Sequence, residues 1–132
     1  MSLYVDSSAL LKRYFDEADA DTADELLSSD PVVVTARLTM IEVRRNIARV
    51  KRDTAAAVAR ESFRGDLARM TLVELDAPTC DRAVAVAEVT GVRTLDALHL
   101  AAAQRVGVTT FLTFDLRQAQ AGRTLGFSVV GA

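Results

Sequence analysis

Four acidic side chains occupy positions from which they could act on the same substrate. Asp6 directly follows the strand-like residues 2–5, and Asp115 follows the strand-like residues 109–114. Glu42 and Asp96 lie in two expected helices, Asp96 in the first turn of its helix. Because ligands gather at the carboxyl ends of the strands in an open parallel sheet, we expect these four carboxylates at one edge of the sheet.

Such a cluster has a chemical consequence. Two carboxylates about 4 Å apart repel each other by about 4 kcal/mol at an effective dielectric constant near 20. A cluster therefore needs protons or a cation, and all-oxygen ligands favour Mg²⁺ or Mn²⁺. These ions bind phosphate oxygens and activate a bound water, so the pattern predicts phosphoryl chemistry with one or two ions.

Each acid also has a structural explanation that stays open at this point. Asp6 and Asp115 could cap the helices that follow them, and Asp96 could stabilise a helix dipole. Glu42 could pair with Arg45 or Asn46 across one helical turn.

Strand-like and helix-like segments alternate along the chain. Strands are expected over residues 2–5, 32–34, 70–75, 109–114 and 127–130. Helices are expected over residues 9–15, 18–28, 36–52, 53–69, 78–90, 95–106 and 115–121, with a break at Asp30–Pro31. Ser7 or Ser8, Thr35 and Thr94 are the expected helix caps. The alternation predicts one α/β/α domain over residues 1–132, with a central, mostly parallel sheet of about five strands.

The charge distribution suggests an interaction with phosphates. Net charge is −2, but residues 37–69 hold nine bases and four acids, a balance of +5. Arg45 and Arg49 in this region, together with Arg93 just before Asp96, are candidate contacts to nucleic-acid phosphates. A solvated helix surface is the alternative for all three.

Composition points to a soluble cytoplasmic protein without a membrane segment. Half of the residues are hydrophobic and 26% are charged. The single cysteine, Cys80, excludes an intrachain disulfide and a Cys-based zinc site. His99, the only histidine, is expected to be a packed or hydrogen-bonded helix residue, with a metal-ligand or proton-shuttle role as the alternative.

The same residues resemble a known family. The segments YVDSSALLKRY, LTMIEVRRNI, RTLDALHLAAA and LTFDLRQAQA, followed by LGFSVV, are similar in order and spacing to the motifs of PIN-domain nucleases. The likeness is strongest to the VapC-type toxins of bacterial toxin–antitoxin pairs, and it covers essentially the whole chain.

The resemblance implies an Mg²⁺- or Mn²⁺-dependent endoribonuclease whose products carry a 5′-phosphate and a 3′-hydroxyl. By the match, Asp6, Glu42 and Asp96 are the core metal-site acids, and Asp115 ligates directly or through water. Ser7 and Thr113 match small hydroxyl residues that support the cluster. The resemblance also implies a homodimer and inhibition by a cognate VapB-like antitoxin.

Other interpretations fit less well or stay open. A haloacid-dehalogenase-type phosphatase needs a second Asp where this chain has Ser8, and a response-regulator receiver needs paired acids where it has Ser7 and Ser8. The open alternative is a PIN-like domain that binds RNA or a partner without cutting.

Overall fold

A computed structural model describes residues 2–15, 19–28 and 32–132 of the chain. Its strands are β1 (Ser2–Val5), β2 (Val32–Ala36), β3 (Thr71–Val73), β4 (Thr110–Thr113) and β5 (Ser128–Gly131). They form one five-stranded sheet in the order β3-β2-β1-β4-β5, with every pair parallel. The predicted sheet is confirmed, and it has no antiparallel member.

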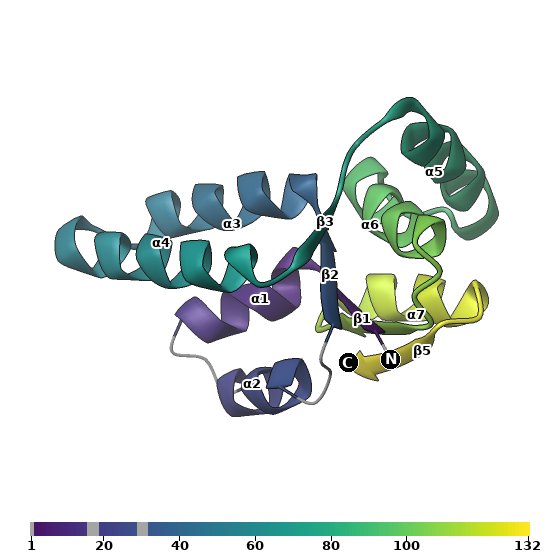
Figure 1. Cartoon of the computed structure of the whole chain (residues 1–132). Coiled ribbons are helices and arrows are strands. Elements are labelled where there is room, and N and C mark those ends of the chain that lie inside the picture. Colours follow the sequence, from purple (N-terminus) through teal and green to yellow (C-terminus); the bar gives the residue numbers. More distant parts are fainter. Residues whose placement is uncertain (1, 16–18, 29–31) are drawn as a thin grey trace.

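Helices cover both faces of this sheet. They are α1 (Ser7–Tyr14), α2 (Ala20–Ser28), α3 (Arg37–Val50), α4 (Asp53–Ala68), α5 (Ala77–Thr90), α6 (Thr94–Arg105) and α7 (Leu116–Thr124). Figure 1 shows α1–α4 on one side and α5–α7 on the other, which confirms the α/β/α class. Ala18, at the predicted start of the second helix, and the predicted break at Asp30–Pro31 lie outside the described residues.

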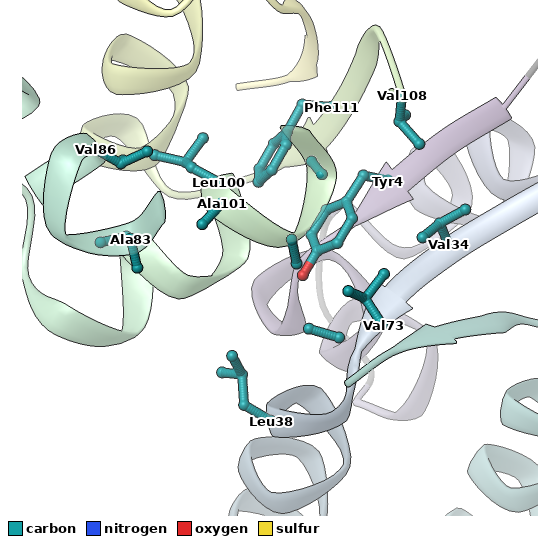
Figure 2. Close-up of a cluster of buried hydrophobic side chains, with 14 of the residues drawn as sticks. Tyr4, Val34, Leu38, Val73, Ala83, Val86, Leu100, Ala101, Val108 and Phe111 are labelled. Atoms are coloured by element: carbon teal, nitrogen blue, oxygen red, sulfur yellow. The ribbon is translucent and has the colours of Figure 1, made fainter. Parts of the chain in front are cut away.

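Two apolar cores follow from the alternation of side chains along the strands. On β1, Leu3 and Val5 pack with α1–α4, whereas Tyr4 points into the core under α5–α7. Figure 2 shows the Tyr4 ring among the aliphatic side chains of this second core, with its hydroxyl oxygen in red. A strand residue with a polar tip therefore reaches from the sheet toward α6.

Helix α6 lies close to the sheet because its inner face is small. Ala101, Ala102 and Ala103 are fully buried and pack with Tyr4 and Val34. Their short side chains let the backbone of α6 lie close to the sheet, where it contacts β2.

The helix caps differ from those predicted. Asp6, not Ser7 or Ser8, caps α1, and the residues preceding α3 and α6 are Ala36 and Arg93, neither with a side-chain cap. Thr35 Oγ1 instead donates to the main-chain oxygen of Val5 at 2.7 Å, which ties β2 to β1. Among the helices of the described residues, none is long and apolar enough to cross a membrane.

Candidate active site

Asp6 lies where β1 ends, beside β4. Its N–H donates to Leu112 O at 3.2 Å, and its side chain is 4% exposed. Oδ1 accepts from Ser8 Oγ at 2.7 Å and from Ala9 N at 3.2 Å, and Oδ2 accepts from Thr113 Oγ1 at 2.5 Å. Asp6 is thus both a helix cap and a rigidly held carboxylate at the rim of the sheet.

The environment of Asp6 opposes its charge. Burial raises the pKa of the Asp6 carboxyl, while His99 and the hydrogen bonds from Ser8, Thr113 and Ala9 lower it in part. A nearby cation would favour the ionised form, which the surrounding protein alone does not fully stabilise.

Glu42 is oriented by two donors from other elements. Its Oε1 accepts from Ser7 Oγ at 2.9 Å and lies 2.7 Å from His99 Nε2. The alternative, a pairing of the Glu42 side chain with Asn46, is not what the structure shows at this residue. Asn46 Nδ2 donates to the main-chain oxygen of Glu42 at 2.9 Å, which leaves the carboxylate to Ser7 and His99. Helix α3 therefore presents the Glu42 carboxylate toward α1 and α6.

A buried relay connects Glu42 to the core of the protein. The hydroxyl of Tyr4 lies 2.7 Å from Nδ1 of His99, and the imidazole is 2% exposed. Burial raises the pKa of the Tyr4 phenol well above its usual value, so the phenol stays protonated and hydrogen-bonds to Nδ1. A carboxylate oxygen only accepts hydrogen bonds, so His99 Nε2–H donates to Glu42, which fixes both the ring and the carboxylate.

Asp96 and Asp115 complete the acidic edge. Asp96 is half-buried in the first turn of α6, and burial raises the pKa of its carboxyl, with further increases from Asp115 and Glu42. His99 and Arg93 act in the opposite direction on that pKa. Asp115 follows β4, where its N–H donates to Thr113 Oγ1 at 3.0 Å and its carboxylate caps α7 by accepting from Gln118 N at 3.0 Å.

The four predicted acids therefore gather from β1, α3, α6 and the β4–α7 junction. Within residues 2–15, 19–28 and 32–132, no three Asp, Glu, His or Cys side chains are arranged to hold one metal ion. The donor chemistry nevertheless fits a hard dication, since the acids supply carboxylate oxygens and two of them have pKa values raised by their surroundings.

Comparison with known proteins identifies the family of the chain. The PIN-domain family model matches residues 3–124. Ribonuclease VapC46 of Mycobacterium tuberculosis is 34% identical over 131 residues, which cover 98% of this chain and 96% of that protein. The chain belongs to the PIN-domain family. Within it, the chain is a VapC-type member.

Solved structures share the fold of this PIN domain. The VapC20 structure of M. tuberculosis, described as a sarcin–ricin loop cleaving toxin, has a TM-score of 0.71 at 23% identity, covering 91% of this chain and 95% of that chain. A toxin–antitoxin complex from Klebsiella pneumoniae has a TM-score of 0.74 at 19% identity, covering 99% and 97% respectively. At these identities the likeness concerns the fold.

The three arginines predicted to contact RNA flank the acids of the PIN domain from two sides. Arg45 and Arg49 lie one and two turns after Glu42 on the same side of α3, and Arg49 donates to Asn46 Oδ1 at 3.1 Å. Arg49 lines a cavity that Asp115 also lines. Arg93, just before α6, lines two cavities together with Asp96.

Sequence reasoning missed the roles of Ser8 and Tyr4 in this PIN-domain site, whereas the prediction of His99 as a packed or hydrogen-bonded helix residue is confirmed. Ser8 bridges Asp6 and β4, since its Oγ also accepts from Phe114 N at 3.0 Å and lies 3.2 Å from Thr113 Oγ1. Tyr4 and His99 orient Glu42. The only sequence signal was their position, Ser8 just after Asp6 and His99 one turn after Asp96.

Proposed function

We propose that this PIN domain is a metal-dependent endoribonuclease and the toxin of a type II toxin–antitoxin pair. The observation that carries the proposal is the half-buried Asp96 carboxyl, whose pKa is raised by burial and further by the carboxylates Asp115 and Glu42. Acids held together in this way favour a dication, and the VapC-type relatives bear the name ribonuclease.

Asp6, Glu42 and Asp96 would hold Mg²⁺ or Mn²⁺, with Asp115 ligating directly or through water. The ion supplies Lewis acidity: it lowers the pKa of a bound water and stabilises negative charge on the phosphoryl group. Asp96 and Asp115 are only partly buried, so their side chains have room to turn toward Asp6 and Glu42, which are held in place by hydrogen bonds.

The remaining residues position these acids and the RNA. Ser8 and Thr113 hold Asp6, and Ser7 and His99 hold Glu42. Arg45, Arg49 and Arg93 attract backbone phosphates to the acidic edge, which would otherwise repel them. The expected products carry a 5′-phosphate and a 3′-hydroxyl.

The proposal extends to partners and location. We propose that a VapB-like antitoxin inhibits the enzyme, that the toxin forms a homodimer, and that it acts in the cytoplasm. Support for an antitoxin comes from the fold likeness to proteins solved as toxin–antitoxin complexes.

A cleavage assay tests the function. The purified protein is incubated with single-stranded RNA and Mn²⁺ or Mg²⁺, with and without a chelator, and the new ends are mapped. We expect chelator-sensitive cutting that leaves 5′-phosphates. Cutting that persists in chelator contradicts the metal requirement, and RNA binding without cutting under any metal supports the non-catalytic alternative.

The buried relay provides a prediction about positioning. Tyr4→Phe removes the hydroxyl that hydrogen-bonds to His99 Nδ1, so we expect RNA cleavage to fall by about tenfold as Glu42 loses its fixed orientation. We also expect the free energy of unfolding to fall by about 1–2 kcal/mol, measured by urea denaturation.

The matched control is Tyr14→Phe. The Tyr14 hydroxyl donates to Asp66 Oδ2 at 2.6 Å in the other core, so this variant loses the same group at a buried site away from the acids. It should lose comparable stability and retain cleavage. Equal cleavage by the two variants would show that the relay has no role in positioning.

A further inference from the structure

A polar cavity opens beside Asp96, on the side of the acids away from α3. It has a volume of about 340 Å³, within the range of small-ligand sites. Its polar lining comes from the last residue of α5, the loop before α6, the first turn of α6 and one face of α7. These residues are Thr90, Arg93, Asp96, Arg117, Gln120 and Thr124.

The two arginines of this cavity lack the ion pairs that five other arginines of the described residues form. Arg13, Arg37, Arg64, Arg69 and Arg105 form ion pairs with carboxylates. Within the part of the chain that the structure describes, the guanidinium groups of Arg93 and Arg117 have no ion pair and no hydrogen bond. Their donors are thus available to an external anion, which Arg binds in a bidentate manner.

The helix geometry of α7 supports a built site. Arg117, Gln120 and Thr124 recur at the spacing of one helix face, while Gln118, Ala119 and Gly122 face the protein interior. Gln120 adds an exposed amide, which both donates and accepts hydrogen bonds and suits the edge of a base.

The cavity is continuous with the acidic edge. A second cavity, of about 600 Å³, contains Glu42 and shares Arg93 and Asp96 with the first. The two guanidinium groups outnumber the single carboxylate of the first cavity, so an anion is favoured at its Arg117 end, next to the acids rather than on them.

We propose that this cavity binds a backbone phosphate of the RNA, with its nucleotide, on one side of the cleaved linkage. Arg117 and Arg93 bind the phosphate, and Gln120 contacts the base. The assignment rests on the proposed ribonuclease function. In it, the residues of this cavity determine how the RNA is positioned across the acids. It adds α7 to the RNA-binding surface, beyond the arginines of α3.

Binding is measured without cleavage, in the Asp6→Asn background, because Asp6 does not line the cavity. A labelled single-stranded RNA of mixed sequence is titrated by fluorescence anisotropy at several salt concentrations. Arg117→Ala should weaken binding by about tenfold and reduce the slope of log K against log salt by about 0.7, the loss of one single-strand phosphate contact. Arg117→Lys should retain that slope.

The control is Arg82→Ala, an exposed arginine of α5 outside the cavity, which should leave binding unchanged. Equal affinities of the Arg117→Ala and Arg82→Ala proteins overturn the assignment. Binding of inorganic phosphate that Arg117→Ala abolishes, with RNA affinity unchanged by the same substitution, would identify a free-anion site and also overturn the assignment. An effect of Arg117→Ala on binding of a co-purifying antitoxin, with RNA affinity intact, reassigns the cavity to a protein partner.

The two proposals fail differently. If the wild-type chain cuts RNA and Arg117→Ala binds RNA normally, the subsite is wrong and the nuclease stands. If the wild-type chain cuts nothing while Arg117→Ala still weakens RNA binding, the nuclease is wrong and the RNA-binding cavity stands.

Discussion

Replacing Asp96 by Asn should abolish RNA cleavage and, at neutral pH, make the protein more thermostable. Loss of one charged oxygen ligand removes electrostatic stabilisation at the reacting phosphate, for which we expect a decrease of about a thousandfold in cleavage rate. Stability should move in the opposite direction because burial, Asp115 and Glu42 all raise the pKa of the Asp96 carboxyl.

The sign of the stability effect follows from proton binding. The unfolded carboxyl ionises near its usual value of 3.8, whereas the folded one ionises at higher pH. Between the two pKa values the folded state binds more protons, so stability falls as pH rises, and the penalty is complete above the folded pKa. Asp96→Asn should therefore match the wild type near pH 3 and exceed its melting temperature at pH 7.

Calorimetry at both pH values measures the difference. We expect the melting temperature of Asp96→Asn to be about 1–3 °C above that of the wild type at pH 7. The shift is small because Asp96 is only half-buried and water screens its charge. Glu74→Gln is the control: Arg37 lowers the pKa of the Glu74 carboxyl, so neutralising it should not raise the melting temperature. An Asp96→Asn protein that is less stable than the wild type at pH 7 would contradict the prediction that the ionised Asp96 carboxylate destabilises the folded state.

Divalent cations should stabilise the wild-type protein strongly. A ligand at about a hundred times its Kd adds about 2.7 kcal/mol to the free energy of unfolding, so we expect saturating Mn²⁺ to raise the melting temperature by about 5 °C or more. The ion relieves the repulsion among Asp6, Glu42, Asp96 and Asp115. It also offsets part of the free-energy cost of burying the charged Asp6 carboxylate.

Two variants show where the stabilising ion binds. Asp96→Asn should lose most of the Mn²⁺-induced shift, whereas Asp81→Asn, which removes an exposed carboxylate on α5, should keep it. Identical shifts in both variants would place the bound ion away from the acidic edge. Scanning calorimetry with and without chelator provides the comparison.

The sheet and the acids at its edge were predictable because both depend on local signals. Val32, Val33 and Val34 are β-branched, and strand-like runs separated by helical ones admit few topologies. Once the strands are parallel, Asp6 and Asp115 must end at the same edge, on neighbouring strands β1 and β4. These inferences need only the order of elements along the chain.

The relay and the caps were not predictable in the same way. Tyr4 is 95 residues from His99, and His99 is 57 residues from Glu42, so their contacts depend on how closely α6 and α3 approach the sheet. Thr35 looked like a cap for the following helix, but a buried hydroxyl gains more by bonding the neighbouring strand and Thr39. Sequence spacing does not reveal which partner a hydroxyl chooses.

The run of small residues at Ala101–Ala103 sets the distance between α6 and the sheet. This distance determines where α6 holds Asp96 for catalysis. Because α6 carries Asp96 and His99 in its first half and rests on these alanines in its second, a bulkier side chain there would lift the whole helix from β1 and β2. The acid and the imidazole would move outward as one rigid body. Substitutions in the interior of the protein would thus move the acidic edge while the acids themselves stay unchanged.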